Sequence, residues 1–111
     1  MPTTPTAHLG PRKRRVPVNI RRTIFIPPGF AAWVPFRGTL LVRRGVTLTP
    51  AFLAHELAHI LQAEDHSWPA AYIAQWVSNR FVYTTMPFEV AARAASTDHW
   101  YLAWARDLLA A

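Results

Sequence analysis

Short runs of β-branched and aromatic residues alternate with turn signals in the first half of the chain. The turn signals are Pro27-Pro28-Gly29, Arg37-Gly38 and Arg43-Arg44-Gly45. This pattern predicts a small antiparallel or mixed sheet of about three strands. Because proline has no N–H to donate to a sheet, Pro17 and Pro35 must lie at strand edges or bulges. The runs that could form strands are Val16–Ile20, Thr23–Ile26, Ala32–Phe36 and Thr39–Val42.

The spacing of apolar residues becomes helical after residue 48. Thr49 followed by Pro50 is a typical N-cap with proline at the first helical position, and it predicts a helix to about Glu64. The sequence therefore predicts an α+β fold in which the N-terminal sheet packs on about three or four α-helices. The other helices are predicted from about Pro69 to Phe81 after Ser67, from Pro87, and from Asp98 to about Leu109, the last two being either separate or one kinked helix.

The chain has 111 residues and no cysteine. That length suits one small domain, which we assign to residues 16–111. Without cysteine the chain has neither disulfides nor thiolate ligands, so any metal must be bound by His, Asp or Glu. A core this small is often marginal, and a bound metal would add to its folding free energy.

Positive charge is concentrated in the N-terminal half. Residues 1–54 contain nine basic side chains and no acid, and the whole chain has a net charge of +6. Residues 1–15 are rich in proline and threonine and include Arg12, Lys13, Arg14 and Arg15, so we predict a flexible basic arm. The arm could contact nucleic acid or another anionic surface, or it could be only a solvated tail.

The hydrophobic runs also bear on location. None approaches the roughly 18 to 20 residues that a membrane-spanning helix needs. The N-terminus carries charges but no apolar segment behind them, unlike a secretory signal. We therefore expect no transmembrane segment and a cytoplasmic protein.

Residues 55–59 have the sequence HELAH, which matches the pattern H-E-x-x-H within the first predicted helix. Histidines four positions apart, here His55 and His59, lie one above the other on a helix and can bind one zinc ion. Glu56 lies beside them, where it can accept a proton from a water that the metal activates. Leu53 and Leu57 fall on the opposite side of this helix, toward the core. The alternative is an amphipathic helix with two surface histidines.

A catalytic zinc site needs a third protein ligand. Asp65 stands six residues after His59, a position used in short-spaced zinc sites, but the glycine that would help the chain turn is replaced by Gln62. Glu89 is the stronger candidate, because it begins a later helix that could return to the histidines. The competing interpretation is that Glu89 only favours the N-terminus of its helix and pairs with Arg93.

These motifs resemble those of gluzincin metallopeptidases, in particular the very small minigluzincin-like domains. The matching segments are Leu48–Pro50, His55–Gln62 and Pro87–Arg93. The resemblance implies a zincin-like fold with Zn²⁺ bound by His55, His59 and Glu89. It also implies hydrolysis of peptide or protein substrates, with Glu56 as the general base. The strand before the zinc helix, Thr39–Arg43, would border the cleft and pair with an extended substrate.

Peptide hydrolysis would also need a donor to the developing oxyanion, for which Tyr83, His66 and His99 are candidates. Two other functions remain open. One is a non-catalytic module in which zinc only stabilises the fold and the basic arm binds the partner; the other is a basic interaction protein without a metal. Since a structural site needs no carboxylate between its histidines, Glu56 favours catalysis.

Overall fold

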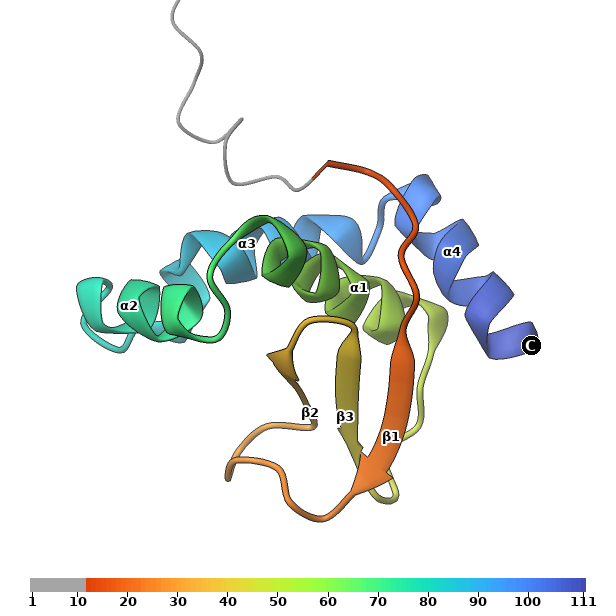
Figure 1. Cartoon of the computed structure of the whole chain (residues 1–111), viewed down its shortest axis with the longest axis horizontal. Coiled ribbons are helices and arrows are strands. Elements are labelled where there is room, and N and C mark those ends of the chain that lie inside the picture. Colours follow the sequence, from red (N-terminus) through yellow and green to blue (C-terminus); the bar gives the residue numbers. More distant parts are fainter. Residues whose placement is uncertain (1–11) are drawn as a thin grey trace, which may run out of the picture.

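A computed structural model describes residues 12–111 as a three-stranded sheet with four α-helices (Figure 1). This arrangement confirms the predicted α+β class, with a small N-terminal sheet and the helices after it. Residues 1–11 of the predicted arm lie outside the described part of the chain. The elements are β1 (Asn19–Thr23), β2 (Ala32–Phe36), β3 (Thr39–Arg43), α1 (Pro50–Asp65), α2 (Ala70–Ser78), the short 3-10 helix η2 (Tyr83–Thr85), α3 (Pro87–Ala95) and α4 (His99–Ala110).

The sheet has the strand order β1-β3-β2. β1 runs parallel to β3, and β2 pairs with β3 as an antiparallel hairpin. The hairpin closes through Arg37 and Gly38, and Gly38 has the positive φ of 71° that such tight turns favour in glycine. Pro35 lies in the edge strand β2, where the pairing register shifts between Trp33 and Phe36. Its predicted place at an edge or bulge is confirmed.

Two expectations about the sheet are wrong. The runs Val16–Ile20 and Thr23–Ile26 do not form two strands, because pairing with β3 selects one strand, β1, that spans the junction between them. The strand Thr39–Arg43 is not at the edge of the sheet, since β1 and β2 flank it on both sides. It therefore has no free edge for a peptide. β2 is the edge strand that lies against α1.

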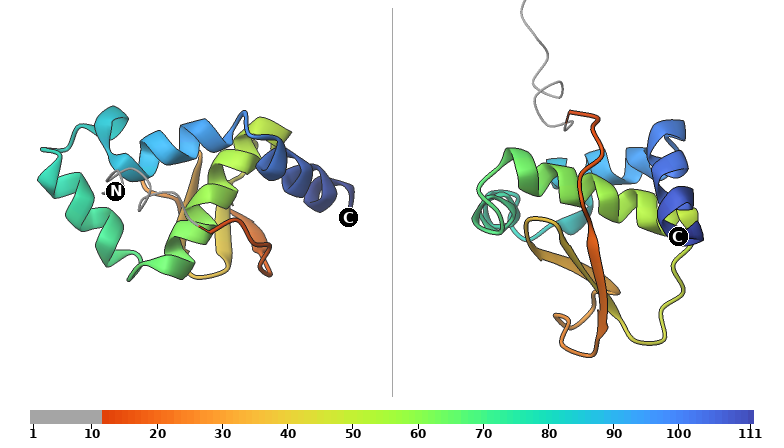
Figure 2. Two further views of the ribbon diagram at one scale, coloured as in Figure 1. Left: turned by 90° about the horizontal axis from the view of Figure 1, so that it is seen from above. Right: turned by 45° about the vertical axis from the view of Figure 1, so that its right-hand side comes forward.

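Helix α1 is the centre of the domain and packs against the sheet, α3 and α4 (Figure 2). Its start is set by Thr49, whose side chain accepts a hydrogen bond of 3.1 Å from the Phe52 N–H, followed by Pro50. Leu53 and Leu57 are fully buried between the sheet and the other helices. Burial on nearly all sides explains why polar side chains of α1 must find partners inside the protein.

The last three α-helices begin and end at points that local features of the chain set. α2 stops at Ser78 rather than at Phe81, because Arg80 and Phe81 take left-handed conformations with φ of 54° and 64°. α3 and α4 are separate helices, and Asp98 caps α4 by accepting from the Trp100 N–H at 2.8 Å. Among the described residues, no helix has the length and apolar content to cross a membrane.

Candidate metal centre

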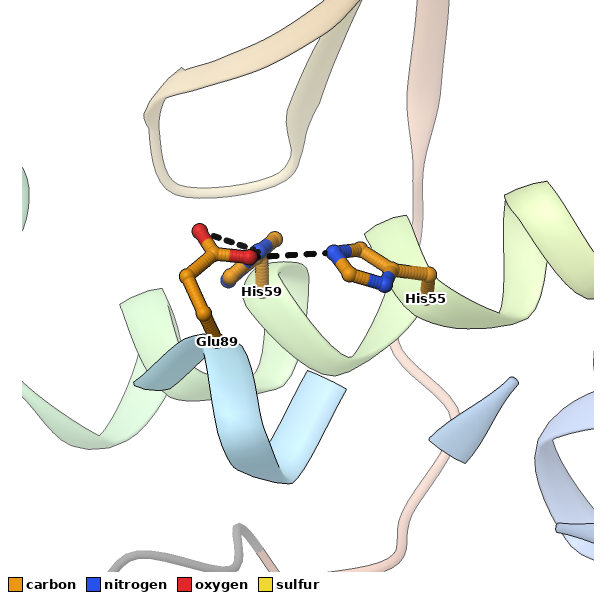
Figure 3. Close-up of side chains that lie close together, drawn as sticks. All are labelled: His55, His59 and Glu89. Atoms are coloured by element: carbon orange, nitrogen blue, oxygen red, sulfur yellow. Dashed lines mark hydrogen bonds and ion pairs between the residues drawn. The ribbon is translucent and has the colours of Figure 1, made fainter. Parts of the chain in front are cut away.

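Three side chains from two helices converge on one point: His55 and His59 from α1 and Glu89 from α3 (Figure 3). Glu89 Oε1 lies 3.1 Å from His55 Nε2 and 3.2 Å from His59 Nε2. Ligand atoms about 2.0–2.1 Å from a tetrahedral ion are separated by about 3.3 Å, so these distances suit one shared ion. Two imidazole nitrogens and a carboxylate oxygen can therefore hold a metal ion here.

Glu89 reaches the histidines because two glutamines hold the backbone of the preceding residue. The Phe88 N–H donates to Gln75 Oε1 at 2.6 Å, and the Phe88 carbonyl accepts from Gln62 Nε2 at 3.0 Å. Pro87 begins α3 and Glu89 follows in its first turn. Both backbone groups of Phe88 are thus fixed by side chains from α1 and α2, which fixes the direction of the Glu89 carboxylate.

Gln62 also orients His59. Its Oε1 accepts from His59 Nδ1 at 2.8 Å, and the whole side chain is buried. Because an amide oxygen can only accept, Nδ1 keeps its proton in both charge states of the ring. Nε2 therefore donates to Glu89 when the ring is charged, and it is the nitrogen that can bind a metal once its proton is lost. Metal-binding histidines are usually held in one tautomer by a hydrogen bond of this kind.

Tyr72 is the third side chain that supports the site. Its hydroxyl donates to Glu89 Oε2 at 2.5 Å, and its ring packs edge-on against His59 at a centroid distance of 5.9 Å. Burial, followed by the hydrogen bond and charge of Glu89, raises the pKa of Tyr72, so the phenol stays protonated. Glu89 Oε1 faces both histidines, and Oε2 also lies 3.2 Å from His59 Nε2.

The ionisable groups of the site are strongly coupled. Burial alone would raise the pKa of Glu89, but hydrogen bonds from His55 and His59 outweigh it and lower the pKa well below the usual range. Burial disfavours charge on His59, yet the hydrogen bond to Glu89 and the charge of Glu56 raise its pKa. The site therefore holds a carboxylate at neutral pH and favours a cation between its ligands.

Glu56 lies beside the ligands and is also buried. Burial raises its pKa, and the charges of His59 and His55 only partly oppose that effect. The residue lines both a small cavity of about 20 Å³, which also touches His59 and Glu89, and an open cleft of about 620 Å³. The smaller space is enough for about one water molecule. Glu56 thus borders both spaces, and the ligand His55 also lines the cleft.

The other residues considered from the sequence lie elsewhere, with one exception. Asp65 is not near the histidines but accepts hydrogen bonds from the Arg12 N–H and the Arg14 guanidinium. His66 caps the end of α1 and packs on Phe88, and His99 is exposed at the start of α4. Tyr83 is the exception: it lines both the small cavity and the cleft.

Arg93 does not pair with Glu89 as the competing interpretation supposed. Its guanidinium donates to the carbonyl of Thr84 instead. The carboxylate of Glu89 points toward the histidines (Figure 3).

The basic residues of the predicted arm pair with acids of the helical half. Lys13 contacts Asp98 at 2.8 Å, and Arg15 contacts Asp107 at 2.7 Å. Arg14 contacts Asp65 at 3.2 Å. These ion pairs partly neutralise the positive charge of Lys13, Arg14 and Arg15. Residues 1–11 of the predicted arm lie outside the described range.

Sequence reasoning missed Gln62, Gln75 and Tyr72 as supporting residues. Gln62 does share the histidine-bearing face of α1, three positions after His59, and that spacing was the available signal. Gln75 and Tyr72 are on α2, whose position relative to α3 no local pattern reveals.

Comparisons with models of known protein families, with curated proteins and with solved structures found no match.

Proposed function

We propose that the protein is a zinc-dependent peptidase of the gluzincin type. The observation that carries this proposal is the convergence of His55, His59 and Glu89 beside a buried carboxylate, Glu56, at the wall of an open cleft. Two histidines and a glutamate form a ligand set typical of catalytic zinc, which leaves the fourth position free. The resemblance of the sequence motifs to minigluzincin-like domains points to the same ligands.

Glu56 would be the general base. A bound Zn²⁺ would supply Lewis acidity, polarising the scissile carbonyl and making water easier to deprotonate. Glu56 would accept the proton of the attacking water and then deliver it to the leaving amine. Its raised pKa suits this exchange, because a carboxylate with a pKa nearer to neutral both takes and returns a proton more readily.

Tyr83 is our candidate for the donor that stabilises the oxyanion. It borders the same two spaces as Glu56, and burial together with the charge of Glu89 raises its pKa, so it remains a donor at neutral pH. His66 and His99 have no comparable position.

A peptide is the proposed substrate because β2, an edge strand of the sheet that residues 12–111 form, lies beside the cleft. The Arg43 N–H donates to the Ala31 carbonyl, so in an antiparallel pair the next residue, Ala32, directs its N–H and carbonyl away from β3. Ala32 lines both the small cavity and the cleft. An extended peptide could add to this edge with its scissile bond near Glu56. Further along, the Val34 carbonyl already accepts from Trp68 Nε1 at 2.7 Å.

The test is peptide cleavage by the zinc-loaded Glu56→Gln variant, measured with a library of fluorogenic peptides. We expect zinc binding to be retained and cleavage to fall at least about a hundredfold, since a general base contributes about 10²–10⁴ in rate. Glu64→Gln is the matched control, because Glu64 is on the same helix but only faces Arg37 on the surface. Undiminished cleavage by Glu56→Gln would refute the proposed role.

The same experiment separates the peptidase from the alternative of a structural zinc module. A wild-type protein that binds one zinc but cleaves no peptide of the library would favour that module. Its metal would then join α1 to α3 and contribute only to folding.

A further inference from the structure

The end of the sheet farthest from the helices carries exposed apolar and basic side chains together. We call it the sheet tip: residues 21–25, where β1 ends, and residues 43–45, where β3 ends. The two strands end side by side because they run parallel, with Thr23 opposite Arg43. Figure 1 shows this end of the sheet projecting away from the helical layer.

Ile24 and Phe25 project into solvent at the sheet tip, with 59% and 82% of their surfaces exposed. A local hydrogen bond and a buried neighbouring residue keep these two side chains exposed. The Phe25 N–H donates to Thr23 Oγ1 at 3.0 Å, and the next residue, Ile26, is buried. Arg43 then fixes the following loop, since its guanidinium donates to the carbonyls of Ile26, Pro27 and Phe30.

The charge of the sheet tip is not neutralised within the described residues. Arg21, Arg22, Arg43 and Arg44 have no carboxylate within 4.0 Å among residues 12–111. Arg22 and Arg43 donate to backbone carbonyls, which hold the guanidinium groups in place but leave their charge intact. Lys13, Arg14 and Arg15, by contrast, face aspartates.

We propose that the sheet tip binds anionic lipid membranes, with Ile24 and Phe25 inserting between head groups and the arginines contacting lipid phosphates. Apolar insertion and attraction of basic residues to an anionic leaflet act together in peripheral membrane binding. The charge of the tip complements such a surface. All six acids of the chain follow residue 55, outside the segment that forms the tip.

The tip suits a membrane better than a nucleic acid. Binding of single strands uses several aromatic side chains along a groove, each stacking on a base. The tip has one aromatic residue, Phe25, next to an aliphatic one, Ile24, which cannot stack. Two adjacent apolar side chains on a protruding turn match the geometry of shallow insertion.

Membrane binding at the tip is independent of the proposed catalysis, although the two surfaces are neighbours. The loop that follows Phe25 continues directly into the cleft, where Pro28, Gly29 and Phe30 form part of the wall. A protein bound through its tip would therefore keep the cleft close to the membrane surface.

Co-sedimentation with lipid vesicles tests the proposal, on the full chain with no metal added or removed. We expect wild-type protein to bind mixed phosphatidylcholine–phosphatidylglycerol vesicles, not phosphatidylcholine alone, and to dissociate as salt is raised. Arg21→Gln and Arg44→Gln should each weaken binding about fivefold. Phe25→Ala should weaken it about tenfold, because the large apolar side chain that inserts into the membrane is lost.

The matched controls are Phe36→Ala and Arg106→Gln. Phe36 is 58% exposed but lies at the opposite end of the sheet, and Arg106 is exposed on α4. Both variants should bind within about twofold of wild type. Circular dichroism confirms folding of each variant. The proposal is overturned if wild type ignores anionic vesicles, if the controls lose as much as the tip variants, or if an oligothymidylate binds through Phe25 while vesicles do not.

Discussion

Replacing Gln62 by methionine tests how far the metal ligands depend on their buried supports. Methionine fills a similar volume but leaves the buried His59 Nδ1–H, which now donates to Gln62 at 2.8 Å, without a partner. It also removes the 3.0 Å bond from Gln62 to the Phe88 carbonyl, which keeps its helical partner within α3. An unsatisfied buried group costs about 1–3 kcal/mol and a lost hydrogen bond about 0.5–1.5 kcal/mol, so Gln62→Met should destabilise the metal-free protein by about 2–4 kcal/mol. Losing the bond that orients a histidine ligand should also weaken zinc binding about 10–100-fold.

Urea denaturation of the metal-free protein measures the first effect, and competition with a chromophoric chelator measures the second. Gln62→Glu is the informative control. Its carboxylate still accepts from His59 Nδ1 but cannot donate to the Phe88 carbonyl, so zinc affinity should recover while stability does not. A folded Gln62→Met protein with wild-type zinc affinity would show that the orientation of His59 does not depend on this bond.

Three further outcomes are expected. Tyr72→Phe removes the 2.5 Å bond to Glu89 and should weaken zinc binding about tenfold by chelator competition; unchanged affinity would contradict its supporting role. The hydrogen bond to Glu89 raises the pKa of His59 despite burial, so zinc must displace a proton from this histidine. Calorimetry of zinc binding in buffers of different ionisation enthalpy should show proton release that grows as pH falls. Binding heats that are the same in all buffers would contradict this proton release. Asp98→Ala should cost about 1 kcal/mol at neutral pH through loss of the α4 cap. Since Lys13 lowers the folded-state pKa of Asp98, its charge stabilises the protein above the unfolded pKa, and the cost measured by denaturation should shrink as pH falls through the folded value.

The parts of the fold that local chemistry controls could be predicted from the sequence. Thr49 and Pro50 mark the start of α1, and Asp98 marks the start of α4, because capping depends on residues next to the helix. The helical spacing of His55 and His59 likewise places both rings on one side of α1. Glu89 could be nominated from its residue type and its position in a later helix.

Features that depend on contacts between distant segments could not be predicted. Strand composition alone marks Thr23–Ile26 as β-like, but only pairing with β3 decides that the strand ends at Thr23 and leaves Ile24 and Phe25 exposed. The same pairing puts β3 in the centre of the sheet and β2 at its edge. Tyr72 and Gln75 support the site only because α2 lies against α3, an arrangement that no local signal specifies.

The pairing of the N-terminal basic residues shows the same limitation. From the sequence, Arg12–Arg15 carry the densest charge of the chain and were the natural candidates for an anionic partner. In the folded chain Lys13, Arg14 and Arg15 face three aspartates from α1, α4 and the α4 cap, and the unneutralised charge lies instead at the sheet tip. Net charge along a sequence locates basic residues but not the carboxylates that folding brings to them.

The central claim is that His55, His59 and Glu89 together hold one zinc ion. Equilibrium dialysis followed by elemental analysis, on wild type and on Glu89→Ala, tests it most directly. We predict close to one zinc per chain for the wild type and almost none for a folded Glu89→Ala protein, whose two remaining histidines would bind far more weakly. A wild type without near-stoichiometric zinc, or a Glu89→Ala protein that keeps its full zinc content, would contradict the claim.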